Sequence, residues 1–250
     1  MAGAMPAAAD LLTASFNPWG VFMNRTVLLA SAAILAVSFG GAASAKAPHP
    51  GVAGPKGNFV HQTIFKTPKG SKTLYDQTDA DSGVGIVSDN FDSGSFDSYD
   101  DQGADDFTVP SGHKWTITEI DAPGVYFNGS GPQDGVNVFV YKDKKGAPGK
   151  SVAEVDNITP TDTGGSFSIN TGGIKLKAGN YWVSVQANMN FVGGAGEWGW
   201  ETSATLHGNP AVFRSAGGFG CANWDTLVNC IGSYGQGPDF MFELKGKDKG

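Results

Sequence analysis

The chain is poor in charged residues and in cysteine. Charged residues make up 16% of its 250 residues, against about 25% in an average soluble protein, and the formal net charge is −7. An acidic chain of this kind does not fit nucleic acid as a partner, because the phosphates would repel it. The two cysteines, Cys221 and Cys230, are too few for a fold held mainly by disulfides. They lie close together in a Gly-rich stretch, so we expect one disulfide between them.

Long apolar runs are absent after residue 45. The one apolar stretch, Thr26 to Phe39, follows Arg25 and precedes the small residues 43–45, a pattern typical of a signal peptide. It is shorter than the roughly 20 residues that a membrane-spanning helix needs. We therefore expect an extended or mis-assigned start at residues 1–22 and a signal peptide at 23–45. The mature protein should be secreted or periplasmic, without a membrane span.

Familiar catalytic motifs are missing as well. The sequence has no Gly-x-Ser-x-Gly and no His-Glu-x-x-His pattern, which removes support for a serine hydrolase or a zinc protease. No Gly-rich phosphate-binding loop precedes a helix. We predict no catalytic residues, and the chain is expected to be a non-catalytic binding or surface module.

Short β-strand patterns fill the rest of the chain. Glycine is abundant, at 37 residues, and runs of β-branched and aromatic residues recur between turn residues. Alternation places Val136, Val138 and Val140 on one face of their strand. The predicted strands are 105–109, 115–120, 125–128, 136–142, 152–158, 166–170, 174–177, 180–188, 197–202, 211–214 and 239–244.

This pattern predicts an all-β domain, a two-sheet antiparallel β-sandwich of the jelly-roll type, at residues 74–246. A flexible leader at 46–73 would precede it, because Pro, Gly, Lys and His are frequent there and no periodic pattern is present. A short tail at 247–250 would follow it.

An acidic segment opens the domain. Between Asp76 and Asp106 there are ten aspartates and no Lys or Arg. Carboxylates and carbonyl oxygens are the ligands that calcium prefers, so a structural Ca²⁺ is one interpretation. A solvated acidic loop is the other. The candidate metal ligands are Asp89, Asp92, Asp100, Asp101, Asp105 and Asp106.

A tryptophan pair is the candidate ligand platform. Trp198 and Trp200 lie on one side of their predicted strand, and Glu197 and Glu201 lie on the other. Aromatic faces stack on sugar rings, so the pair could bind carbohydrate together with Trp224 or Tyr126; core packing is the alternative. The two glutamates are about 13 Å apart along a strand, too far for a glycosidase pair. A hydrolase with its acids on different strands stays open.

Several motifs resemble a family of largely uncharacterised exported proteins and accessory domains of Gram-negative bacteria. The matching stretches lie between Leu74 and Gly246 and read LYDQ, GADDF, GVYFNG, PTDTGGSF, GNYWVSVQ, WGWE, GNPAV and PDFMFEL. The resemblance implies secretion and a jelly-roll-like sandwich, and it implies no catalytic residues. We expect a secreted module that binds a glycan or another cell-envelope component. A carbohydrate-active hydrolase or a structural component of the extracellular matrix is the alternative.

Overall fold

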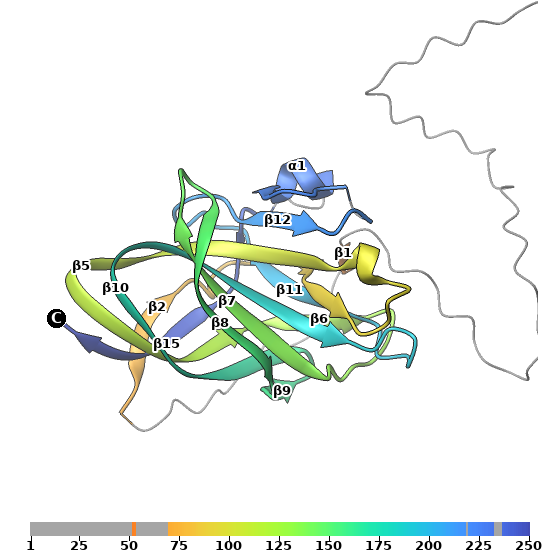
Figure 1. Ribbon diagram of the computed structural model, residues 1–250, viewed down its shortest axis with the longest axis horizontal. Helices are drawn as coiled ribbons and strands as arrows, with labels where there is room; N and C mark the ends of the chain where they lie inside the picture. The colour runs from red at the N-terminus through yellow and green to blue at the C-terminus, as the bar shows by residue number, and fades with distance from the viewer. Residues whose placement is uncertain (1–51, 54–69, 219, 233–236) are drawn as a thin grey trace, which may run out of the picture. The chain divides into compact units, whose positions relative to one another are not determined.

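The computed structural model describes residues 52–53 and 70–250, apart from 219 and 233–236. These residues form a sandwich of β-strands with little helix (Figure 1). The predicted all-β, two-sheet fold is confirmed. The predicted start segment and signal peptide lie outside the described residues.

The smaller sheet has the strand order β1-β3-β11-β14, with β6 also paired to β11. All its pairs are antiparallel. The strands are β1 (Val52–Ala53), β3 (Asp81–Val87), β6 (Gly124–Phe127), β11 (Glu197–Ser203) and β14 (Asp239–Phe240).

The larger sheet has the order β13-β12-β5-β10-β7-β8. Strand β15 pairs with β5 and β2, while β9 and β4 pair with β10; the β4–β10 pair is parallel. Its strands are β2 (Lys72–Asp76), β4 (Asp89–Phe91), β5 (Asp101–Ala122), β7 (Gly135–Asp143), β8 (Pro148–Ile158), β9 (Thr161–Thr163), β10 (Ser166–Met189), β12 (Val212–Ser215), β13 (Asp225–Thr226) and β15 (Glu243–Lys249).

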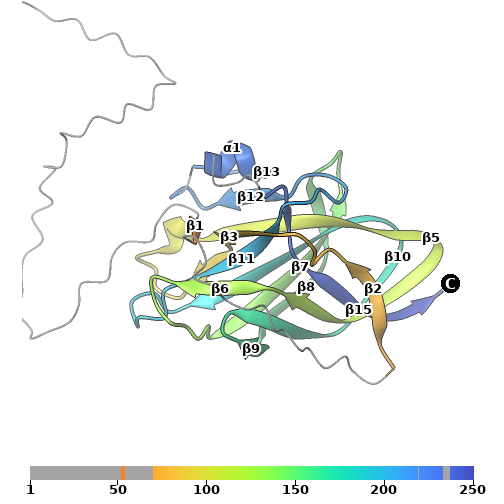
Figure 2. The ribbon, with the colours of Figure 1, turned by 180° about the vertical axis from the view of Figure 1, so that it is seen from behind.

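Two long strands form the centre of the larger sheet. β5 and β10 run side by side along the sandwich (Figures 1 and 2). Each joins segments that the sequence predicts as separate strands. Register shifts at Asn170/Ile174 and Lys177/Gly179 absorb the turn residues between them, and Gly172, Gly173 and Gly179 have positive φ there. Glycine tolerates that conformation, so the pairing continues across the irregularity.

The core lies between the two sheets. Val136, Val138 and Val140 of β7 are fully buried on one face of their strand, as the alternation predicts. A run of stacked rings fills the middle of the core. Neighbouring centroids are 4.7 Å apart for Phe167–Trp198, 6.2 Å for Trp198–Trp200 and 4.5 Å for Trp200–Phe240. Aromatic pairs at these separations contribute beyond the area they bury.

The acidic segment is not a solvated loop. It contains β3, β4 and the start of β5, and Asp89, Asp101 and Asp105 are buried. Their carboxylates accept hydrogen bonds from backbone N–H groups, at Trp198 for Asp89 and at Phe240 for Asp105. These bonds offset part of the cost of burying a carboxyl group. The segment is therefore part of the sandwich.

Both predicted domain ends need correction. The predicted tail at 247–250 is wrong for Lys247–Lys249, which belong to β15 and pair with Lys114–Thr116 of β5. The leader is not wholly irregular either, because it contains β1 and the start of β2. Lys72–Asp76 pairs with β15, so the sandwich begins at least two residues before the predicted boundary at 74.

The predicted disulfide is present. Cys221 and Cys230 are bonded, with their Cα atoms 5.7 Å apart. Cys230 lies in the short helix α1 (Leu227–Ile231), which packs beside β12 (Figure 1). Among the described residues a 3₁₀ turn, η1 (Asp97–Tyr99), is also present. Neither helix of the described residues has the length and apolar character required to cross a membrane.

Candidate functional site

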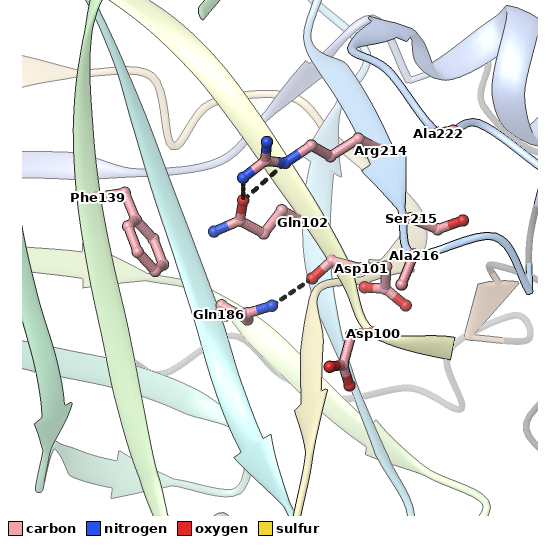
Figure 3. A pocket seen from close by; sticks show the side chains of 9 residues that line it. All are labelled: Asp100, Asp101, Gln102, Phe139, Gln186, Arg214, Ser215, Ala216 and Ala222. Atoms are coloured by element: carbon pink, nitrogen blue, oxygen red, sulfur yellow. Dashed lines mark hydrogen bonds between the residues drawn. The ribbon is translucent and has the colours of Figure 1, made fainter. Parts of the chain in front are cut away.

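A pocket opens on the outer face of the larger sheet, away from the core between the sheets. It has a volume of about 380 Å³, within the range of small-ligand sites. Figure 3 shows Phe139 on one side, Arg214, Ser215 and Ala216 on the other, and two glutamines between them. The lining residues are Asp100, Asp101, Gln102, Phe139, Gln186, Arg214, Ser215, Ala216 and Ala222.

Polar side chains from neighbouring strands form the floor of the pocket. The Arg214 guanidinium of β12 donates to the Gln102 amide oxygen of β5, with Nε 3.0 Å away and Nη2 2.5 Å away. Gln186 of β10 donates its Nε2 to the carbonyl oxygen of Asp101 at 2.7 Å. Arg214 and Gln102 are register partners, so sheet pairing itself fixes their approach. Both glutamines are largely buried, and these contacts hold their orientation.

Aromatic residues support one wall. The Arg214 Cζ atom lies 4.5 Å from the centroid of the Trp224 ring, and Trp224 meets Tyr141 edge-on at 5.8 Å. Phe139 lies parallel to Tyr141 on the same strand, at 6.1 Å. Tyr141 is buried beneath these neighbours, whereas Phe139 is half-buried and lines the pocket. Phe139 therefore offers a ring to a ligand.

Two adjacent carboxyl groups border the pocket. The Asp100 Oδ1 accepts from the N–H of Phe91 at 2.8 Å, and the Asp101 Oδ1 accepts from the N–H of Asp89 at 2.9 Å. Burial raises the pKa of Asp100, and the Phe91 N–H opposes that rise. Burial raises the pKa of Asp101 well above its usual range, and the nearby Glu197 carboxyl adds to the rise. Asp101 therefore carries less negative charge than a free aspartate.

Arg214 brings a positive charge to the pocket. Among the described residues no carboxylate lies within ion-pair distance of its guanidinium, which binds a neutral amide and a ring instead. Guanidinium groups have five N–H donors in a fixed plane, more than Gln102 uses. The arginine can therefore donate to a ligand in the pocket.

The predicted calcium ligands are dispersed over the domain. Asp100 and Asp101 border the pocket, and Asp89 lies next to Asp101 in the interior. Asp105 binds Gln77 and Phe240, Asp106 binds Asn209, and Asp92 is exposed. Within the part of the chain that the structure describes, no three His, Cys, Asp or Glu side chains form a group able to hold a metal ion. The six aspartates do not form one site.

The predicted tryptophan platform is wrong for its main pair. Trp198 and Trp200 are 0% exposed, and their indole N–H groups donate to the backbone oxygens of Gly165 and Met241. Rings buried in this way cannot stack on an external ligand. Tyr126 donates to Asp162 on a different part of the sandwich. Trp224 alone lies beside the pocket, through its contact with Arg214.

The two glutamates beside the tryptophans are also inaccessible. Glu197 is 0% exposed and accepts a hydrogen bond from the Asn128 side chain, and Glu201 is 2% exposed. Neither lines the pocket. A hydrolase that uses these glutamates is therefore not compatible with the structure.

Comparison with known proteins gives a likeness of fold. No family model and no curated protein matches the chain. A solved structure of the cysteine protease and lectin-like domains of Cwp84, a surface layer associated protein of Clostridium difficile, matches with a TM-score of 0.50. The identity is 10%, and the match covers 73% of this chain and 37% of that one. At this identity the likeness shows the fold alone.

The sequence interpretation did not identify seven of the nine pocket residues, among them Gln102, Phe139, Gln186 and Arg214. Two signals were available. Arg214 is the only arginine after Arg25, and Phe139 falls on the face of its strand opposite the three core valines. The glutamines had no such signal, because only the sheet pairing brings these strands together.

Proposed function

We propose that the protein is an exported, non-catalytic module that binds a saccharide of a cell surface in the pocket formed by β5, β7, β10 and β12. The observation that carries this proposal is the composition of the pocket. A half-buried aromatic ring, Phe139, faces a guanidinium, two amides and the carboxyl group of Asp100, with the buried Asp101 beside it. Sugars require both kinds of surface, since their ring faces are apolar and their edges carry hydroxyl groups.

The polar groups of the pocket complement the hydroxyl groups of a sugar. Arg214 and the Gln102 amide N–H groups can donate, and Asp100 can accept. Gln186 already donates its amide N–H groups to the carbonyl oxygens of Asp89 and Asp101. Buried polar groups that stay paired orient a ligand and give specificity, whereas the aromatic face supplies apolar contact area. The likeness to a structure that includes a lectin-like domain supports the proposal at the level of the fold only.

Export is supported by the disulfide and by the signal-peptide pattern. Disulfides persist in oxidising compartments and are rare in the bacterial cytoplasm. The pattern at residues 23–45 lies outside the described residues and stays a prediction. Mass spectrometry of the N-terminus of the exported protein tests it, with cleavage after Ala45 as the expected result.

Co-sedimentation with insoluble polysaccharides and cell-envelope fractions tests binding. The protein should be retained by at least one of them, and Phe139→Ala should reduce the affinity about tenfold or more. Val152→Ala is the matched control, because Val152 is an exposed apolar residue on the edge strand β8. If Phe139→Ala is retained as well as the unmodified protein, the binding site lies outside this pocket. Absence of retention on every fraction would contradict the proposal.

Two alternatives make different predictions. A hydrolase would release soluble sugar, but it needs two accessible carboxyl groups, and of the two carboxyls at the pocket Asp101 is buried and bonded to the Asp89 N–H. A structural matrix component would form oligomers that grow with concentration and would bind no soluble saccharide. Sugar release and sedimentation velocity, measured on the same preparation, separate both from a binding module.

A further inference from the structure

The polar floor of the pocket continues into a cluster of four asparagines on the same face of the sheet. Asn137 donates its Nδ2 to the Gln186 Oε1 at 3.4 Å, which joins the cluster to the pocket. The cluster comprises Asn90 of β4, Asn137 of β7, Asn157 of β8 and Asn188 of β10. We name it the asparagine cluster.

The asparagines converge although they come from four strands. Asn188 accepts from Asn90 at 3.0 Å and from Asn137 at 2.8 Å, and it donates to Asn157 at 3.4 Å. Asn157 has a φ of 52°, and its N–H donates to the Asn137 Oδ1 at 2.9 Å. This left-handed conformation lies at a register shift between β7 and β8. Bulges of this kind re-aim a side chain, here towards the cluster.

The cluster is accessible. Asn90, Asn137 and Asn188 are half-buried and Asn157 is exposed. Amide groups on a solvated surface need no partner from the protein, so a converged set of four is more than folding requires. Asn137 and Asn188 use their amide donors and acceptors to hold the cluster together, whereas Asn90 and Asn157 use only part of theirs. The remaining donors and acceptors of Asn90 and Asn157 match the hydroxyl groups of a sugar.

The pocket and the cluster together span several strands. Gln102 pairs with Arg214, and Gln186 pairs with Asn137, so the polar row crosses β12, β5, β10 and β7. Three strand spacings of about 4.8 Å give a row of about 14 Å, longer than one sugar ring. A single monosaccharide therefore fills one end only.

The charges favour a neutral chain. In the pocket, Arg214 and Asp100 bring opposite charges. The cluster itself has no ionised group; the exposed Asp156 precedes Asn157 in the chain, and the exposed Asp134 donates its N–H to the Asn188 carbonyl oxygen. These carboxylates would repel an acidic chain. We infer, on the basis of the proposed saccharide function, that the protein binds a chain of several neutral sugar residues, one in the pocket and the next along the asparagine cluster.

Isothermal titration with a length series of neutral oligosaccharides tests this inference. The probes are the xylose, mannose and β-1,4-glucose series, from the monosaccharide to the hexasaccharide, with oligogalacturonides as the acidic comparison. For one neutral series the affinity should rise about tenfold or more between the monosaccharide and the tetrasaccharide. Asn137→Ala should remove most of that gain, whereas Phe139→Ala should weaken binding at every length.

The control is Asn180→Ala, an exposed asparagine on the same strand as Asn188 but about 20 Å from Gln186. It should leave the whole series unchanged. Equal affinity at all lengths, or binding of oligogalacturonides alone, would overturn the inference and leave the pocket as a saccharide site. Binding of no saccharide, neutral or acidic, would overturn the proposed function as well.

Discussion

The guanidinium of Arg214 lies over the ring of Trp224, with Cζ 4.5 Å from the ring centroid, and donates to the amide of Gln102. This relationship connects the disulfide loop to the sheet. Trp224 lies between Cys221 and Cys230, and Arg214 and Gln102 belong to paired strands. The loop therefore places one wall of the pocket, while sheet pairing places its floor.

Replacing Arg214 should weaken saccharide binding without unfolding the protein. Arg214→Ala removes donors from the pocket, and Arg214→Lys should fail to restore binding, because an ammonium cannot reproduce the planar contact with both Trp224 and Gln102. We expect a loss of about tenfold or more for each, measured by titration. Lys142→Ala is the control, since Lys142 lies over another ring, that of Tyr181. Full binding by Arg214→Lys would show that charge alone is sufficient.

Trp200→Ala should destabilise the domain strongly. The ring is 0% exposed and packs against Trp198 and Phe240, so its removal leaves a cavity in the core. The expected loss is about 3 to 5 kcal/mol of unfolding free energy, measured by denaturant titration. A ligand role would instead give a stably folded protein that fails to bind.

The disulfide should contribute both to the stability of the domain and to saccharide binding in the pocket. The backbone N–H of Ser215, a pocket residue, donates to the carbonyl of Cys221 at 2.6 Å. Cys221→Ser with Cys230→Ser should cost about 2.5 to 3 kcal/mol of stability by chain entropy. It should also weaken binding at temperatures where the protein is still folded, because Trp224 loses its anchorage. If the folded variant binds the saccharide with unchanged affinity, the disulfide loop does not contribute to binding in the pocket.

Buried carboxyl groups should make the domain more stable in mild acid than at neutral pH. Burial raises the pKa of Asp89 and of Asp101 well above their usual range, with each carboxyl close to the other, and raises the pKa of Asp121 to about 6. Above the unfolded value of about 3.9, the folded state then binds more protons than the unfolded state. The free energy of unfolding therefore falls as pH rises from about 4 through 6, where Asp121 loses its proton. It continues to fall at higher pH as Asp89 and Asp101 lose theirs.

Thermal melts in EDTA at about pH 5 and pH 7.5 measure this dependence. The melting temperature should be several degrees lower at the higher pH, since 1 kcal/mol corresponds to about 2 to 4 °C for a domain of this size. Asp89→Asn, which keeps an oxygen to accept from Trp198, should reduce the difference, whereas the exposed Asp156→Asn should not. A melting temperature that rises with pH would contradict the raised pKa values of these buried carboxyl groups.

Repeating the melts with calcium in place of EDTA tests the calcium prediction. A cation beside Asp89 and Asp101 would neutralise the two carboxyls as a proton does. We therefore propose that calcium binds there. Added calcium should raise the melting temperature at neutral pH, and EDTA should lower it. Equal melting temperatures in calcium and in EDTA would refute it and leave protons as the neutralising species.

The fold was largely predictable from the sequence, and the site was not. Alternation in Val136–Val140 identified a core face, because a two-residue period depends only on the strand itself. The same alternation placed Trp198 and Trp200 together, but it could not tell whether their shared face was inside or outside. The pocket depends on pairs such as Gln102 and Arg214, which are more than 100 residues apart and meet only through the strand order of the sheet.

The environment of the acidic segment could not be predicted from the sequence either. Ten aspartates with no basic residue indicate a solvated loop or a metal site by composition. In the fold, Asp89, Asp101 and Asp105 instead accept hydrogen bonds from backbone N–H groups of neighbouring segments. Composition cannot reveal such partners, since those of Asp89 and Asp105 lie more than 100 residues away in the chain.

NMR signals of the side-chain amides and of the Arg214 Nε–H, followed during titration with the saccharide that retains the protein, show whether this pocket is the binding site. The side-chain signals of Gln102, Gln186 and Arg214 should shift first and most, followed by those of Asn137 and Asn188 with longer oligosaccharides. Trp198 and Trp200 indole signals should stay close to their free positions. Shifts confined to residues outside the pocket, with Gln102 and Arg214 unchanged, would contradict the assignment of this face as the binding site.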